Sequence, residues 1–501
     1  MTTRMTTANL DSLTSSGGMP SEAELSRLAN QLFGEISQEP KPVDQHPMAF
    51  PASSEPTLTA AESLPFQLQP PGGWQPSFSA SQLTAPQLGP IQPLDAYQIR
   101  KDFPILDQQI HGRPLIWLDN GATTQKPEAV IERLNHFYRS ENSNIHRGAH
   151  ELAARATDAY EGARATVAKF LGASSSEEIV FVRGTTEAIN LVAQAWGRRE
   201  LQTGDEIVIT HLEHHANIVP WQILCQQTGA VLKVAPVDDH GQVLLEAYER
   251  LFTARTKLTA FTQVSNALGT ITPAQEMVQI AHRHGSRVLV DGAQGVAHEQ
   301  VNMQSLDADW YVFSGHKIYG PTGIGVLYGK RELLQAMGPW QGGGNMISDV
   351  TFERTIYQEP PNRFEAGTGN IADAIGLGTA LEYVSNLGLR NIAAAEQELL
   401  SYATEGLCCI PGLRLLGQPK EKAGVLSFVL EGFRSEDVGS ALNQLGIAVR
   451  AGHHCAQPIL RRFGVETSVR ATLAIYNTKE DVDALVAGLL RLTHGSLRKR
   501  P

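Results

Sequence analysis

The amino-acid sequence predicts an α/β fold: a large domain with a mostly parallel central sheet, a smaller C-terminal α+β domain and a disordered N-terminal arm. Three observations support this prediction. From about residue 96, short β-rich runs alternate with helical stretches, a pattern typical of parallel strands with helices on both faces of the sheet. From about residue 385, helices alternate with fewer strands. The composition also changes sharply near residue 95, so the 501 residues divide into more than one folding unit.

The first 95 residues differ in composition from the rest of the chain. They hold 13 of the 27 prolines, three basic residues, nine acidic residues and none of the cysteines. A segment so rich in Pro, Ser and Gln buries too little apolar surface to offset its chain entropy, which predicts disorder. A short amphipathic helix is predicted over residues 21–37, because Ser21 to Glu24 form a capping box and Pro40 follows the apolar spacing. The spaced apolar residues at 66–88 suit recognition motifs, and a passive tail is the open alternative.

The regular elements of the folded region follow in order along the chain. Helical spacing between the β-rich runs predicts helices at residues 186–196, 220–227 and 273–284. Because strands and helices alternate, the connections are crossovers, which favours a parallel sheet. The β-rich runs that we predict as strands are residues 178–182, 206–210, 231–234, 258–264, 287–291 and 310–314.

The composition excludes several classes of protein. No apolar run approaches the roughly 18–20 residues that would cross a bilayer, and the N-terminus lacks the apolar core of a secretory signal. Four cysteines are too few and too unevenly placed for a disulfide framework. A formal charge of −11 disfavours nucleic acid as a partner. We therefore expect a cytoplasmic protein with no membrane or nucleic-acid partner.

Two predicted strands are followed by residues that carry chemistry. The strand at 287–291 ends in Asp291, and a carboxylate at the C-terminal edge of a parallel strand points into the crevice where α/β folds bind ligands. Lys317 follows the next strand, among small and polar residues. Such a lysine can form a Schiff base, while the carboxylate keeps a pyridine nitrogen protonated. Either residue alone is more often structural, but the pair in this order favours a cofactor site.

Two further motifs bear on the same cofactor. Gly184, Thr185 and Thr186 join a strand to a helix, where backbone amides and hydroxyls can hold a phosphate. His214 and His215 follow the strand at 206–210, a position from which an imidazole can lie over a flat ring. A metal is an alternative for these histidines, but neighbouring histidines point in different directions and no carboxylate or cysteine has ligand spacing. We therefore expect no metal.

Motifs spread along the region after residue 95 match one family. They make the chain from about 96 to 501 resemble the cysteine desulfurases of the SufS type, group II members of the fold-type I pyridoxal-phosphate enzymes. The first 95 residues lie outside the resemblance. The matching stretches are Leu118–Ala122, Asn144–Gly148, Arg183–Asn190, Glu213–Trp221, Val264–Thr270, Asp291–Gln294, Ser314–Lys317, Arg363–Thr368 and Arg450–Cys455.

The resemblance implies a role for each matching residue. Lys317 would hold pyridoxal 5'-phosphate and later carry the substrate proton, Asp291 would pair with the pyridine nitrogen, and Gln294 would bind the ring hydroxyl. His214 would stack on the ring. The carboxylate of L-cysteine would be clamped by Arg470, with Asn266 and Arg450 as further substrate-binding residues. The phosphate would be held by Thr185, Thr186, Ser314 and His316, joined by Thr368 from the second subunit of a homodimer.

One of the four cysteines has a setting that suits catalysis. Cys455 follows two histidines in a turn-rich loop, and by resemblance it attacks the sulfur of bound cysteine, leaving alanine and an enzyme persulfide. Cys225 lies in an apolar helical stretch and is expected to be a packing residue. Cys408 and Cys409 are adjacent among apolar residues and are expected to be structural.

The resemblance also implies an organisation and partners. Residues 117–384 would form the large cofactor-binding domain, and residues 96–116 with 385–501 the small domain. A SufE- or SufU-like protein would accept the sulfur. Some SufS-type enzymes with long N-terminal extensions are encapsulin cargo, so residues 1–95 would bind an encapsulin shell and place the enzyme inside a nanocompartment. The alternatives are a selenocysteine lyase or another fold-type I enzyme such as a kynureninase-like hydrolase and, in a different class, an inactive scaffold.

Overall fold

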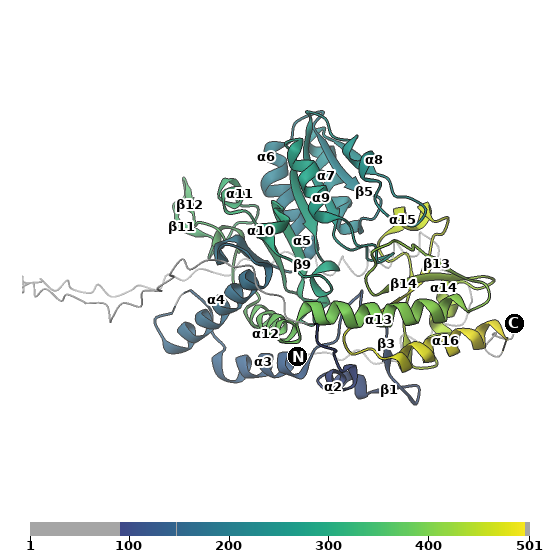
Figure 1. Ribbon diagram of the computed structural model, residues 1–501. Coiled ribbons are helices and arrows are strands. Elements are labelled where there is room, and N and C mark those ends of the chain that lie inside the picture. The colour runs from purple at the N-terminus through teal and green to yellow at the C-terminus, as the bar shows by residue number, and fades with distance from the viewer. Residues whose placement is uncertain (1–90, 147, 496–501) are drawn as a thin grey trace, which may run out of the picture. The chain divides into compact units, whose positions relative to one another are not determined.

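The computed structural model describes residues 91–146 and 148–495, which fall within one compact unit (Figure 1). The predicted helix over residues 21–37 lies outside the described residues. Within the described ranges, no helix combines the length and the apolar character needed to cross a membrane. The division into a large and a small domain stays a prediction.

The central element is a seven-stranded, mostly parallel sheet, as predicted. Its strands lie in the order β4 (Ile179–Val182), β10 (Gly325–Gly329), β9 (Trp310–Ser314), β8 (Arg287–Asp291), β7 (Thr256–Thr262), β5 (Glu206–Thr210) and β6 (Val231–Ala235). Strand β10 runs antiparallel to both of its neighbours, while the pairs from β9 across to β6 are parallel.

The strands of this sheet are apolar because both faces are covered. In β9, Trp310 and Val312 belong to one core cluster and Tyr311 and Phe313 to the other, and all four are buried. Helices α5 (Thr185–Val192), α7 (Val219–Thr228) and α11 (Arg331–Ala336) pack on the first face. The helices on the second face are α4 (Glu151–Leu171), α9 (Ala274–Arg283), α10 (Met303–Leu306) and α12 (Ile371–Leu387).

A second sheet of four antiparallel strands lies in the C-terminal part of the chain. Its strands are β13 (Leu413–Leu416), β14 (Val425–Leu430), β17 (Ser468–Thr472) and β16 (Arg450–Gly452). Strands β13, β14 and β17 share a third core cluster with α13 (Leu389–Cys408), α14 (Ser435–Asn443) and α16 (Lys479–Thr493). In Figure 1 these elements lie together at the green to yellow end of the chain.

The remaining short elements connect these layers or lie at the surface. The early segment reaches the C-terminal part, because β3 (Ile116–Trp117) pairs in parallel with β15 (Ile447–Ala448). Two small hairpins are formed by β1 (Gln109–Ile110) with β2 (Arg113–Pro114) and by β11 (Ile347–Val350) with β12 (Thr355–Tyr357). The other helices are α2 (Ala96–Arg100), α3 (Glu128–His136), α6 (Arg198–Glu200), α8 (Leu245–Glu249) and α15 (Gln457–Arg462).

Candidate active site

A cavity of about 250 Å³ lies at the carboxyl ends of the central strands. The register puts Thr262, Asp291 and Val312 side by side on β7, β8 and β9, so the residues after these strands meet at one edge of the sheet. This edge is where α/β folds bind ligands. The predicted site residues that line the cavity are Thr185, Thr186, His214, Asn266, Asp291, Gln294, Ser314, His316, Lys317, Arg450, Cys455 and Arg470.

Asp291 and Lys317 come from neighbouring strands. Asp291 ends β8, is 3% exposed and accepts a 2.9 Å hydrogen bond from the amide of Ala293. Lys317 ends the short helix η9 (Gly315–Lys317), which follows β9 directly. Burial raises the pKa of Asp291, and the lysine charge partly opposes that shift. Burial likewise lowers the pKa of Lys317 to about 8, and the Asp291 carboxylate partly opposes it.

The depressed pKa of Lys317 predicts a pH dependence for its amine. In cofactor-free protein, acylation of Lys317 should rise with pH around a midpoint near 8 rather than near the ordinary lysine value of 10.5, because only the neutral amine reacts. Asp291→Asn should move the midpoint lower still, since the carboxylate stabilises the ammonium form. Competitive acylation followed by peptide mass spectrometry measures both midpoints. A midpoint near 10.5, or one that rises in Asp291→Asn, would contradict this account of the site.

His214 is held neutral over the cavity. It caps the helix η7 (His215–Asn217), where its Nδ1 accepts a 3.0 Å hydrogen bond from the amide of Ala216, so the ring proton lies on Nε2. Burial, with a smaller effect from Lys317, lowers the pKa of His214 to about 3. The preceding Glu213 is fully buried and accepts 2.6 Å hydrogen bonds from Thr210 Oγ1 and Asn217 Nδ2. These bonds fix the turn that presents His214.

The start of α5 and the end of β9 form a polar cradle. The hydroxyl of Ser314 accepts a 2.9 Å hydrogen bond from the amide of Thr185 and lies 2.8 Å from the Thr185 hydroxyl. A Cβ on Gly184 would come within 3.1 Å of Ser314 Oγ, so a glycine allows this close approach. Thr186, in the first turn of α5, is exposed at the same helix N-terminus. Hydroxyls and helix amides of this kind bind phosphate.

His316 and Gln294 connect the cradle to the chain around residue 121. Burial, with smaller effects from Lys317 and Lys126, lowers the pKa of His316 to about 4. Its carbonyl accepts a 3.0 Å hydrogen bond from the amide of Thr124. Gln294 is buried, and its Nε2 donates a 2.7 Å hydrogen bond to the carbonyl of Gly121.

Arg470 brings a buried cation to the same cavity. It lies on β17, is 2% exposed and donates hydrogen bonds to the carbonyl of Asn266 at 2.9 Å and to Asp119 Oδ1 at 3.2 Å. Arg450, whose side chain is 47% exposed, reaches Asp119 Oδ2 at 3.5 Å. Asp119 thus pairs with both arginines. Sequence reasoning gave no role to Asp119, although it is a carboxylate just after β3.

Cys455 lies in the loop between β16 and α15, is half-buried and lines the cavity. Its carbonyl accepts a 2.7 Å hydrogen bond from the amide of His215, and its amide donates a 3.0 Å bond to His453 Nδ1. The intervening His454 is buried and bonds to Ser468 Oγ at 2.8 Å. The sequence spacing gave no reason to place Cys455 beside His215, because the two lie far apart in the chain.

Thr368, which the resemblance assigns to the phosphate site, does not line this cavity. Thr368 is exposed and lines a different hollow of the same chain with Arg183, Glu187 and Phe364. Its hydroxyl accepts a 3.4 Å hydrogen bond from Asn144 Nδ2. A contribution of Thr368 to this cavity therefore needs a second copy of the chain, as the homodimer prediction states.

The donor set of the cavity fits pyridoxal 5'-phosphate. Within the described part of the chain, the Lys317 amine makes no hydrogen bond or ion pair, and three buried polar atoms lining or flanking the cavity lack partners: Asn266 Oδ1, Arg470 Nε and His454 Nδ1. Unpaired buried polar groups are costly unless a ligand satisfies them. Lys317 and Asp291 match the aldehyde and the ring nitrogen, and the Thr185–Ser314 cradle matches the phosphate.

Comparisons with known proteins agree with this geometry. Residues 116–485 match the family model "Aminotransferase class-V". The chain is 67% identical over 403 residues to a cysteine desulfurase of Synechococcus elongatus, covering 80% of this chain but 64% of that relative. It is 53% identical over 404 residues to a cysteine desulfurase of Dickeya dadantii, covering 80% of this chain and 98% of the relative. The chain thus spans less than two thirds of the Synechococcus relative's length.

Solved structures show the same likeness. A cysteine desulfurase from Escherichia coli in an S-sulfonic acid form is 42% identical, with a TM-score of 0.75, and the match covers 80% of this chain and 99% of that one. The apo cysteine desulfurase from Thermococcus onnurineus is 39% identical, with a TM-score of 0.76, and the match covers 79% and 98%. The family match spans both the strand-end residues and the Cys455 loop. This chain therefore belongs to the aminotransferase class-V family and, within it, to the cysteine desulfurases.

Proposed function

We propose that this protein converts L-cysteine to L-alanine and transfers the sulfur to Cys455 as a persulfide, from which an acceptor takes it. One observation carries the proposal: a single cavity joins Lys317 and Asp291 at the strand ends to the buried Arg470 and the Cys455 thiol. The first pair suits a pyridoxal-phosphate site, and the second suits an amino acid with a sulfur atom. The relatives named cysteine desulfurase support the same reaction.

The bound cofactor supplies an electron sink for the negative charge that develops on the substrate Cα. The residues of the chain move the proton and position the cofactor and the substrate. Lys317, with its pKa near 8, can take and return the Cα proton near neutral pH. The buried Asp291 carboxylate would pair with the ring nitrogen of the cofactor. His214 stays neutral and can cover the ring face without repelling Lys317.

Arg470 orients the substrate and Cys455 receives its sulfur. A buried guanidinium can clamp a carboxylate bidentately, which fixes where the substrate's Cα–H and Cβ–S bonds point. The Cys455 thiolate then forms an S–S bond to the substrate sulfur while the Cβ–S bond breaks. The electron pair of that bond stays with the carbon skeleton, which gains a proton and leaves as alanine. The overall exchange is cysteine plus Cys455 thiol to alanine plus Cys455 persulfide, with no outside oxidant.

If Arg470 binds the substrate carboxylate bidentately, substitutions of Arg470 and Arg450 should change the KM for L-cysteine to different extents. Arg470→Lys should raise the KM for L-cysteine at least about tenfold, because a lysine loses the bidentate geometry and one charge-assisted hydrogen bond is worth roughly 1.5–3 kcal/mol. Arg450→Lys is the matched control and should have a smaller effect, since its side chain is 47% exposed and makes a longer contact with Asp119. Steady-state alanine production gives KM and kcat for both. An equal or larger effect from Arg450→Lys would contradict the assignment of Arg470 as the clamp.

The proposal extends to the enzyme subgroup, the oligomeric state and the partner proteins. The protein is a SufS-type, group II enzyme that works as a homodimer, in which the exposed Thr368 of one subunit completes the phosphate site of the other. A SufE- or SufU-like protein takes sulfur from Cys455, which lines the cavity and is only half-buried. The N-terminal arm binds a partner, with an encapsulin shell as the leading candidate, and so directs a cytoplasmic enzyme into a nanocompartment.

Removal of the arm should separate targeting from catalysis. The deletion should stop at residue 90, because the Gln92 amide donates a 2.9 Å hydrogen bond to Asn391 Oδ1, Leu94 packs on the core and Asp95 caps α2. We expect desulfurase activity to stay within about twofold, since no cavity residue is removed. Co-purification with a co-expressed encapsulin shell should be lost. A fusion of residues 1–90 to an unrelated protein that stays outside the shell, while the full chain enters, would contradict the targeting role.

A further inference from the structure

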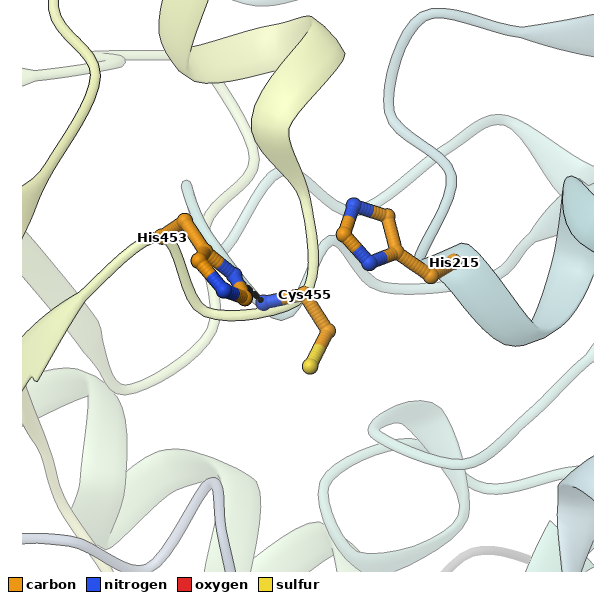
Figure 2. Close-up of side chains that lie close together, drawn as sticks. All are labelled: His215, His453 and Cys455. Carbon is orange, nitrogen blue, oxygen red and sulfur yellow. Dashed lines mark hydrogen bonds between the residues drawn. The ribbon is translucent and has the colours of Figure 1, made fainter. Parts of the chain in front are cut away.

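Two histidines lie on either side of Cys455. Ligand atoms of His215, His453 and Cys455 all fall within 4.8 Å of one another. Figure 2 shows the two imidazole rings flanking the loop that carries the Cys455 side chain, with His215 coming from a separate segment. His215 opens η7 after β5, whereas His453 and Cys455 belong to the loop before α15. The cluster therefore forms only in the folded chain.

The backbone holds these three residues in place. His454 and Cys455 both have positive φ values, 52° and 53°, which are uncommon for residues other than glycine. This turn buries His454 and leaves the two flanking residues, His453 and Cys455, on the open side. The 2.7 Å bond from the His215 amide to the Cys455 carbonyl joins the two segments. A locally unfavourable turn that is held by specific contacts is typical of functional sites.

Each of the two histidines has a ring nitrogen that is available to bind a metal. The Nδ1 of His453 is occupied by the Cys455 amide, and in the described part of the chain its Nε2 makes no hydrogen bond. The Nε2 of His215 receives only a 3.4 Å contact from the amide of Gln457, and its Nδ1 has no described partner. An imidazole nitrogen that makes no hydrogen bond, or only a long one, can bind a metal.

The sequence predicts no metal because no cysteine is near these histidines in the chain, but the fold brings Cys455 beside them. We propose that His215, His453 and Cys455 bind one Zn²⁺ ion. Two imidazoles and one thiolate form a ligand set that zinc prefers, and three protein ligands leave a fourth position for water. Tetrahedral zinc would bring the ligand atoms to roughly 3.3–3.7 Å apart. The ligand atoms must therefore move closer by up to about 1.5 Å, which rotation of the exposed His453 and the half-buried Cys455 allows. Binding replaces the thiol proton, which goes to solvent, and no electron is exchanged.

Zinc at this site would inhibit sulfur transfer, a consequence that rests on the proposed function. The sulfur lone pair that would attack the substrate is used in the Zn–S bond, so Cys455 cannot accept sulfur. Arg450 and Lys317 line the same cavity and add positive charge, which weakens the hold on a cation. The three-ligand site is therefore reversible, and a chelator restores the free thiol.

The first test is zinc binding by the full-length holoenzyme, without substrate. Equilibrium dialysis against Zn²⁺ should give one reversibly bound equivalent per chain, and zinc X-ray absorption should show one sulfur and two imidazole nitrogen ligands. Cys455→Ser and His453→Gln should each weaken the site at least tenfold. The glutamine keeps an acceptor for the Cys455 amide, so the loop is retained while Nε2 is lost. His240→Ala removes an exposed histidine outside the cluster and should bind as the wild type does.

The second test follows the thiol itself. At free Zn²⁺ about 100-fold above the dissociation constant, the reactive fraction of Cys455 falls to about 1%, so its alkylation should slow about 100-fold. Peptide mass spectrometry resolves Cys408 and Cys409, which are exposed and serve as internal controls. Wild-type binding no tighter than that of Cys455→Ser, a zinc site without imidazole, or unprotected Cys455 would each overturn the proposal. Zinc binding without alanine formation would instead contradict only the proposed function.

Discussion

Replacing Lys317 by alanine is expected to lower alanine formation from L-cysteine at least about 10³-fold, the range in which general acid–base catalysis contributes. Lys317 holds the amine whose pKa is lowered to about 8 and lies next to the Asp291 charge. If Lys317 has the proposed roles, alanine removes both the covalent attachment for the cofactor and the base for the Cα proton. The visible absorbance of the bound cofactor should shift to that of a cofactor held only by the phosphate cradle. Steady-state alanine production and absorbance spectra measure the two effects.

Lys101→Ala is the matched control for this prediction. Lys101 is an exposed lysine that caps the end of α2 and does not line the cavity. Its replacement should leave both the absorbance band and the rate unchanged. A Lys317→Ala enzyme that forms alanine at the wild-type rate would show that the lysine has no part in the reaction. A Lys101→Ala enzyme with the same loss would point to general damage by the substitution.

Replacing Cys455 by serine should stop alanine release while leaving cysteine binding intact. Serine keeps the size and polarity of the side chain but lacks a sulfur nucleophile that can form an S–S bond. The residues that would bind the amino acid, Lys317 and Arg470, are unchanged, so L-cysteine should still alter the spectrum of the bound cofactor. Rapid mixing with L-cysteine, followed by alanine quantification, should show a normal spectral change and a rate lowered at least about 10²-fold.

Serine variants at the other cysteines are the controls. Cys408 and Cys409 were expected to be structural but are exposed at the end of α13. Cys225 is half-buried in α7, where burial raises the pKa of its thiol. A raised pKa leaves less thiolate to attack sulfur. Each of these three serine variants should release alanine as the wild type does. Loss of alanine release in one of them, with Cys455→Ser active, would move the sulfur acceptor to that cysteine.

Much of the fold could be predicted because the strands are buried on both faces. The runs ending at Thr210, Asp291 and Ser314 are continuous apolar segments, and the structure has strands at each of them. Strand β10 was not among the runs named from the sequence, since it contains glycines at both ends. Its antiparallel placement between β4 and β9 is a long-range pairing that local patterns do not contain.

The site could be predicted where reactive side chains lie at or just after the carboxyl end of a strand. Asp291 ends strand β8 and Lys317 ends the short helix that follows the neighbouring parallel strand β9, so the sheet itself brings them together. Contacts between distant segments were not predictable in this way. The pairing of Asp119 with both Arg450 and Arg470 depends on how β16 and β17 pack beside the chain after β3. The convergence of His215 on Cys455 depends on two turns whose geometry the residue spacing does not reveal.

The most direct test of the central claim is to locate the sulfur after one turnover. Wild-type holoenzyme is exposed briefly to L-cysteine, its thiols are blocked, and its peptides are analysed by mass spectrometry. We predict one additional sulfur atom on the peptide that contains Cys455, in an amount equal to the alanine released, and none on the peptides that contain Cys225, Cys408 or Cys409. Alanine released without sulfur on Cys455, or with sulfur on another cysteine, would contradict the account.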